Sequence, residues 1–259
     1  MVLVNKQSFL ALFKGIAVQE GAKLFDLLEA TLEYGYTTFS SDFLTPNVWK
    51  KLPEKFFDVT IETYGGFEKS DRKMICFYKG LSLREPFPIK MVKVTATSKF
   101  HTLRHKDFMG SILSCGVRRE KFGDLMQVES ELYVPIVEGI EPVLIKEVTC
   151  IGKSPCKIEV VDPKSVYFVE NNFKESVVIV SSLRLDAVVS ELSKLPREKG
   201  AGLIEAGQVM VDYEIEKSKS KEISEGTTLT IRQFGKFKFD VVLGKTGKER
   251  LKLRIKRYE

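Results

Sequence analysis

The sequence is poor in the residues on which most metal sites and many active sites depend. It contains two histidines, four cysteines and one tryptophan in 259 residues, and no two cysteines are spaced as a CxxC pair. A structural zinc site needs four cysteine or histidine ligands at close spacing, so we expect no metal site. No apolar run approaches the roughly 18 residues that cross a bilayer, which argues against a membrane protein.

The first residues also lack an export signal, since they show no charged start, apolar stretch and small-residue cleavage site. We therefore expect a cytoplasmic protein, in which disulfides are rare. Hydrophobic residues make up 43% of the chain and charged residues 29%, which are ordinary values for globular proteins. At ~150 residues per domain, the length predicts between one and three domains.

Positive charge is concentrated toward the C-terminus. The whole chain has a net charge of +6. Residues 181–259 contain 17 Lys and Arg against 12 Asp and Glu, whereas the first 180 residues carry a net charge of only +1. Residues 232–258 alone hold ten basic side chains against two acidic ones, Asp240 and Glu249. Such a segment is typical of surfaces that bind phosphates, although charge alone fits a solvated basic tail equally well.

The hydrophobic pattern predicts two regions before this basic segment. Residues 1–56 are expected to be helical, with Ser8 capping the first helix, Gly35 ending the second and Pro46 opening the third. Residues 57–165 mix both periods, with strands expected at 58–64, 74–78, 89–97, 122–128 and 157–161, and helices at 105–115 and 134–147. This order predicts an α+β domain of the ferredoxin-like or RNA-recognition type.

A third region is expected at residues 181–259, with residues 166–180 as its connection to the middle region. Ser182 is the expected cap of one helix, Pro196 the start of a second and Gly207 its end. Two short strands are expected to follow at residues 209–213 and 228–232. The pattern therefore predicts two short helices that lead into a small sheet.

The chain ends in a pattern typical of an amphipathic β-hairpin. Basic side chains alternate with Leu and Ile along residues 250–256, and lysine alternates with phenylalanine along residues 236–239. A turn at residues 244–248 would pair the two strands, with one face apolar and the other basic. Like charges on neighbouring strands cost stability unless an anion lies between them, so the hairpin indicates a nucleic-acid partner.

No complete catalytic motif is present. His101 and His105 have the spacing of a zinc-protease motif but lack its glutamate. Arg184-Leu185-Asp186 is similar to the string that holds the catalytic aspartate of pseudouridine synthases, but helical periodicity follows it here. We expect Asp186 to orient Arg184, and we predict no enzyme activity, no catalytic residue and no small-molecule cofactor.

Residues 182–226 resemble the S4 RNA-binding domain. The resemblance rests on Ser-Leu-Arg-Leu-Asp at 182–186, Leu-Pro-Arg-Glu-Lys at 195–199, Leu-Ile-Glu-Ala-Gly-Gln-Val-Met-Val at 203–211 and Glu-Gly at 225–226. In that family two helices present basic side chains to structured RNA, and a small β part braces them. The resemblance implies RNA contacts for Arg184, Arg197 and Lys199, with the shape of the RNA backbone as the main feature that is read.

The middle region extends the resemblance to most of the chain. Three segments are similar to the signature of YlmH-type proteins: Tyr-Gly-Gly-Phe at 64–67, His-Lys-Asp-Phe-Met-Gly-Ser-Ile-Leu at 105–113 and Gly-Val-Arg-Arg-Glu-Lys-Phe-Gly-Asp at 116–124. This family combines a helical start, an RNA-recognition-like middle and a C-terminal S4 domain. The resemblance implies a factor that binds the large ribosomal subunit with peptidyl-tRNA and assists alanine tailing of stalled nascent chains. A link to cell division has also been attached to the family.

We therefore predict a monomeric, non-enzymatic protein that binds ribosomal RNA in the large subunit, with tRNA as a candidate second ligand. The predicted RNA-binding side chains are Arg184, Arg197, Lys199, Arg232, Lys236, Lys238, Lys245, Arg250, Lys252 and Arg254. A second RNA or partner site is predicted at His105, Lys106, Arg118, Arg119 and Lys121. Two alternatives stay open: an RNA-modifying enzyme with a pocket near Asp107 or Asp186, and a cell-division adaptor whose middle domain binds a protein.

Overall fold

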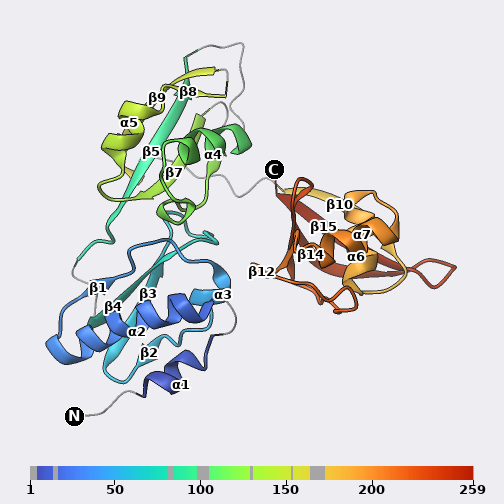
Figure 1. Ribbon diagram of the computed structural model, residues 1–259, viewed down its shortest axis with the longest axis horizontal. Coiled ribbons are helices and arrows are strands. Elements are labelled where there is room, and N and C mark those ends of the chain that lie inside the picture. Colours follow the sequence, from blue (N-terminus) through green and yellow to red (C-terminus); the bar gives the residue numbers. More distant parts are fainter. Residues whose placement is uncertain are drawn as a thin grey trace. The chain divides into compact units, whose positions relative to one another are not determined.

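The computed structural model describes residues 5–13, 17–80, 85–97, 105–128, 131–152, 154–163 and 173–258. It consists of two compact units, Met1–Val169 and Glu170–Glu259, which we describe separately (Figure 1). Among the described residues, no helix combines the length and the apolar character needed to cross a bilayer.

The first half of the first unit packs helices on a small antiparallel sheet. Its helices are α1 (Lys6–Leu10), α2 (Ala17–Tyr34) and α3 (Pro46–Trp49), and its strands are β1 (Thr38–Phe39), β2 (Lys55–Phe56), β3 (Val59–Tyr64) and β4 (Met74–Lys79). The strand order is β1-β4-β3-β2. The core contains Leu24 and Leu28 from α2 and Phe77 from β4, so these leucines of α2 face the sheet.

The helix ends agree with the sequence only in part. Gly35 follows α2 with φ +73°, a conformation that favours glycine, and Thr45 precedes Pro46 at the start of α3, both as predicted. The predicted cap at Ser8 is wrong, because Asn5 caps α1 by accepting a hydrogen bond from the Gln7 N–H, and Ser8 lies within the helix.

The second half of the first unit has the predicted ferredoxin-like arrangement. It contains β5 (Ile89–Ala96), α4 (His105–Ser114), a short 3-10 helix η1 (Arg119–Lys121), β6 (Met126–Val128), β7 (Glu131–Val137), α5 (Glu141–Glu147), β8 (Cys150–Ile151) and β9 (Ser154–Val161). All strand pairs are antiparallel, in the order β6-β7-β5-β9-β8. Helices α4 and α5 cover one face, where Phe108, Ile112 and Leu144 pack on the sheet (Figure 1).

Two predictions for the middle region are wrong. Residues 134–147 do not form one interrupted helix but strand β7 followed by α5, because Val134 and Ile136 alternate with Tyr133 and Pro135 across the sheet. A continuous apolar run fits a buried strand and a helix equally well. The strands predicted at 58–64 and 74–78 belong to the sheet of the N-terminal half, so the ferredoxin-like arrangement begins with β5.

The two halves of the first unit meet at a joint formed by residues 65–72. Phe67 packs against Met91 and Tyr133 on the face of the ferredoxin-like sheet that α4 and α5 leave uncovered. The carboxylate of Asp124 accepts hydrogen bonds from the backbone N–H groups of Asp71 at 2.6 Å and Arg72 at 3.0 Å. Apolar packing and charge-assisted hydrogen bonds therefore fix this loop to the sheet.

Replacing Gly66 with alanine is expected to loosen this joint. Gly66 has φ +87°, and a Cβ there would lie 2.5 Å from Pro135 Cγ. We expect the free energy of unfolding of the first unit to fall by about 3 kcal/mol, from strain and overpacking together. The fluorescence of the single tryptophan, Trp49, reports on this unit because its indole N–H donates to the Asp71 carbonyl.

The matched control is Gly139→Ala. Gly139 has φ +89°, but its Cβ would meet nothing within 4 Å, so only the cost of about 1 kcal/mol for backbone strain applies. Equal losses for the two variants in denaturant titrations would contradict a packed joint at Gly66.

The second unit places two helices on one face of a six-stranded antiparallel sheet. The strands are β10 (Phe173–Val180), β11 (Val209–Val211), β12 (Glu214–Ile215), β13 (Thr228–Ile231), β14 (Gly235–Lys245) and β15 (Leu251–Tyr258), and the helices are α6 (Leu185–Ser193) and α7 (Arg197–Glu205). The strand order is β10-β15-β14-β13-β11-β12. Val188 and Ile204 from the helices pack on Phe239, Leu253 and Ile255, which confirms the apolar face of the predicted hairpin.

Two further expectations for this unit are wrong. Residues 173–180, read as part of a connection, form strand β10, which pairs with β15 from Phe173↔Tyr258 to Val180↔Leu251. The cap of α6 is Arg184 and not Ser182. Its position is fixed by an isolated β-bridge to Glu222, a contact between residues far apart in the chain that local sequence does not reveal.

Candidate nucleic-acid interface

A buried carboxylate holds two arginines together at the start of the helix pair. The side chain of Asp186, in the first turn of α6, is 7% exposed. Arg184 donates to it from Nε and Nη2, both at 3.2 Å. Arg197, at the start of α7, donates from Nε at 3.2 Å and from Nη2 at 3.0 and 3.1 Å. The sequence-based expectation that Asp186 orients Arg184 is therefore correct, and Arg197 is oriented as well.

The charges of this cluster stabilise each other. Burial alone would raise the pKa of Asp186, but the hydrogen bonds and positive charges of Arg184 and Arg197 outweigh it and hold the pKa below its usual value. Hydrogen bonding to Asp186 in turn raises the pKa of Arg184. The aspartate is thus ionised at neutral pH, which suits an orienting group better than a general base.

Both guanidinium groups keep donors for a ligand. The side chains of Arg184 and Arg197 are 39% and 53% exposed. A guanidinium has five N–H donors in a rigid fork, and the Nη1 nitrogens of both residues donate no hydrogen bond within the described part of the chain. The remaining donors of two neighbouring forks can bind phosphate oxygens with defined geometry.

A lysine-rich loop lies beside the two arginines. The backbone carbonyls of Lys219 and Lys221 accept hydrogen bonds from the N–H groups of Asp186 and Leu185, which fixes the loop at the start of α6. Sequence reasoning missed these lysines, although the alternation Lys-Ser-Lys-Ser-Lys at 217–221 was a usable signal. We call Arg184, Arg197, Lys199 and residues 217–221 the helix-pair surface.

Five of the hairpin cations lie on the side of the sheet opposite α6 and α7. The side chains of β10, β14 and β15 that point away from α6 and α7 form what we call the open sheet face: Phe173, Glu175, Val177, Ile179, Lys236, Lys238, Asp240, Lys252, Arg254, Lys256 and Tyr258. Four predicted RNA-binding residues, Lys236, Lys238, Lys252 and Arg254, belong to it. The structure therefore divides the predicted cations between two faces, and the remaining ones belong to neither.

Internal carboxylates neutralise part of this charge. Asp240 pairs with Arg254 and Lys256, whose hydrogen bonds lower its pKa, so the anion expected between the strands is partly supplied by the chain itself. Lys245 pairs with Glu249, and Arg250 donates to the carbonyl of Ile179. By contrast, Lys199, Arg232, Lys238 and Lys252 form no ion pair within the described residues.

The predicted second site is part of a structural contact in the first unit. The side chain of Asp42 is 7% exposed and pairs with Arg118 at 3.2 Å and Lys121 at 2.8 Å. Arg119 donates to the carbonyls of Phe122 and Gly123. Burial, together with the positive charge of Arg72, lowers the pKa of Arg119 to about 10. Arg118 and Lys121 thus link the segment around η1 to the N-terminal half, whereas Arg119 is bonded locally. The side chains of His105 and Lys106 lie outside the described residues.

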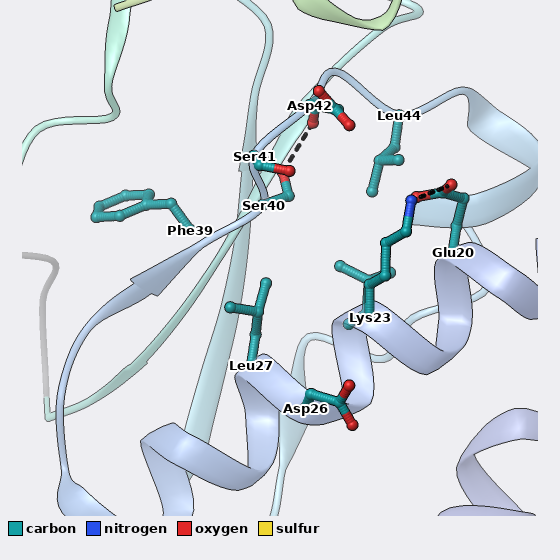
Figure 2. A pocket seen from close by; sticks show the side chains of 10 residues that line it. Glu20, Lys23, Asp26, Leu27, Phe39, Ser40, Ser41, Asp42 and Leu44 are labelled. Atoms are coloured by element: carbon teal, nitrogen blue, oxygen red, sulfur yellow. Dashed lines mark hydrogen bonds and ion pairs between the residues drawn. The ribbon is translucent and has the colours of Figure 1, made fainter.

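A cavity of about 260 Å³ lies between α2 and residues 39–44. Figure 2 shows the lining residues Glu20, Lys23 and Asp26 on the helix and Ser40, Ser41 and Asp42 on the following segment. Lys23 pairs with Glu20, Lys6 pairs with Asp26, and Asp42 is held as described above. The charged groups that line the cavity therefore already have partners, and neither Asp107 nor Asp186 lines the cavity.

Two family models match the regions just described. The model described as "Putative RNA-binding domain in YlmH" matches residues 83–165, and the S4 domain model matches residues 183–229. The chain is thus similar to YlmH-type proteins in its middle region and to S4 domains in its C-terminal region. The first match starts shortly before β5 and therefore excludes β3 and β4, which belong to the other sheet of the first unit.

One curated protein and one solved structure are similar to this chain. "Ribosome-associated protein quality control protein P2" from Bacillus subtilis (strain 168) is 28% identical over 202 residues, which cover 77% of this chain and 79% of that protein. The solved structure of "Cell division protein ylmH from Streptococcus pneumoniae" is 18% identical with a TM-score of 0.48, and the match covers 59% of this chain and 95% of that one. The S4 match includes the helix-pair surface but ends before β14 and β15.

Proposed function

We propose that this protein binds structured RNA of the large ribosomal subunit through its helix-pair surface. The observation that carries the proposal is the pair of arginines held by Asp186 within the segment that matches the S4 domain. Two adjacent guanidinium groups with free donors suit the phosphates of an RNA helix, whose bases lie in a groove that side chains cannot read.

The Bacillus relative's name supports a ribosomal role. We propose that this protein acts in the cytoplasm as a monomer in ribosome-associated quality control, where it assists alanine tailing of stalled chains with peptidyl-tRNA as a further ligand. Both matched domains are RNA-binding ones, which fits a protein that acts by binding and not by catalysis. Mapping modified nucleotides in ribosomal RNA after incubation with the protein would expose a catalytic role.

Sedimentation with dissociated ribosomal subunits tests this proposal. The tagged protein is expected to migrate with the large subunit and to be released by high salt, because phosphate contacts weaken as salt rises. Large subunits that carry peptidyl-tRNA should retain more protein than vacant ones at the same salt concentration. Migration with the small subunit alone, or with neither subunit, would overturn the proposal.

A further inference from the structure

The open sheet face has a chemistry that differs from that of the helix-pair surface. It carries five cations, Lys236, Lys238, Lys252, Arg254 and Lys256, against the carboxylates of Glu175 and Asp240. Lys238 and Lys256 are direct cross-strand partners. Such like-charged neighbours stabilise the sheet only when an anion lies between them. Asp240 forms ion pairs with Lys256 and Arg254, whereas Lys238 and Lys252 have no carboxylate partner in the described chain.

Exposed aliphatic side chains flank these cations. Val177 is 55% exposed and lies opposite Arg254, and Ile179 is 38% exposed and lies opposite Lys252. Both are on β10, which is one of the two edge strands of the sheet. Exposed apolar side chains beside a cationic row indicate a partner that is both anionic and apolar.

Aromatic rings extend the same face at its other end. Tyr258 packs edge-on against Phe173, with ring centroids 4.9 Å apart. The ammonium group of Lys236 lies 4.3 Å from the ring centroid of Tyr258 and 4.7 Å from that of Tyr213. The rings and the cation are thus fixed before a ligand arrives, which reduces the entropy lost on binding.

We propose that the open sheet face binds an unpaired RNA segment. An unpaired strand offers phosphates to Lys238 and Lys252, and it offers the flat faces of its bases to Val177, Ile179 and Tyr258. A duplex would present phosphates alone and leave the aliphatic side chains in water. The alternative ligand is an acidic protein segment, but the face suits it less well. The carboxylate of Glu175 would repel acidic side chains, and the rings of Phe173 and Tyr258 offer them no charge. This inference extends the RNA-binding function proposed above to a second, independent surface.

Binding of two probes, a uridine oligonucleotide and an RNA hairpin, to the full chain tests the inference. Lys238→Ala with Lys252→Ala is expected to weaken oligonucleotide binding about tenfold and to lower the slope of log affinity against log salt by about 1.4, which is ~0.7 per lost phosphate contact. Hairpin binding should change by less than about twofold, because the helix-pair surface stays intact. Arg184→Ala with Arg197→Ala should show the reverse pattern.

The matched control is Lys23→Ala with Lys146→Ala, which removes equal charge from side chains that are 60% and 82% exposed in the other unit. Equal losses for the open-face variant and this control would overturn the inference, and so would equal losses for both probes. Stronger competition by polyglutamate than by the oligonucleotide would assign the face to a protein. If the native chain bound neither probe, the proposed function itself would fail.

Ultraviolet crosslinking gives an independent readout. Irradiation with the uridine oligonucleotide should attach nucleotides to the peptide that contains Tyr258, and Tyr258→Leu should abolish that adduct while it keeps an apolar side chain at the position. Adducts confined to peptides of α6 and α7 would contradict an unpaired strand on this face.

Discussion

Replacing both Arg184 and Arg197 with alanine is expected to weaken the binding of structured RNA about 100-fold near physiological salt. Each arginine offers charge-assisted hydrogen bonds in a fixed fork, and together they form the centre of the helix-pair surface. The slope of log affinity against log salt should fall by about two units, because about 0.9 counterions per phosphate contact are no longer released. Titration of an RNA hairpin at several salt concentrations measures both quantities.

A second variant separates charge from geometry. Alanine at both positions leaves the buried Asp186 without its charged partners, so that the loss of binding could follow from damage to the fold. Arg184→Lys with Arg197→Lys keeps both charges but loses the planar fork. It should retain most of the salt dependence and still bind about tenfold more weakly than the native protein. Native affinity in the lysine variant would contradict a role for the fork.

Replacing Asp186 with asparagine is expected to weaken RNA binding about tenfold, although it makes the surface more positive by one charge. Long-range electrostatics predicts tighter binding from this change. The geometry predicts the opposite, because an amide presents N–H donors to guanidinium groups that require acceptors, and both arginines lose their fixed orientation. Tighter binding by the asparagine variant would show that Asp186 does not position the arginines.

The same variant has a readout in the pH dependence of stability. Since the folded-state pKa of Asp186 lies below its ordinary value, the ionised carboxylate stabilises the fold at neutral pH. That contribution is lost as the pH falls below the ordinary aspartate range and through the lowered pKa. Acid titrations of unfolding should therefore show a smaller loss of stability for Asp186→Asn than for the native protein.

Local patterns were enough to predict most elements of the second unit. The spacing of Leu185, Val188 and Val189 predicts a helix, and the alternation of Leu253 and Ile255 with basic residues predicts a strand, as the structure confirms. The pairing of β10 with β15 could not be predicted from the sequence, because no turn signal links residues 173–180 to the end of the chain. The division of the cations between two faces depends on that pairing and on the helix layer.

The site itself was predictable at the level of residue type but not of partnership. Arg184 and Arg197 follow from the resemblance to S4 domains, whereas the carboxylate that they share, Asp186, lies 11 positions from Arg197 and reaches it only through tertiary packing. The same limit applies to Arg118 and Lys121, whose partner Asp42 is more than 70 residues away. The sequence identifies the basic side chains, but only the fold shows which of them already pair with a carboxylate.

The Phe67 contact has a consequence for fragments of this protein. A fragment that begins at residue 83, where the similarity to the YlmH model starts, would lack Phe67 and expose part of Met91 and Tyr133, although these side chains are 0% and 8% exposed in the full chain. Newly exposed apolar side chains on a sheet favour self-association. The bounds of the segment that is similar to the YlmH model are therefore not the bounds of a fragment that folds on its own.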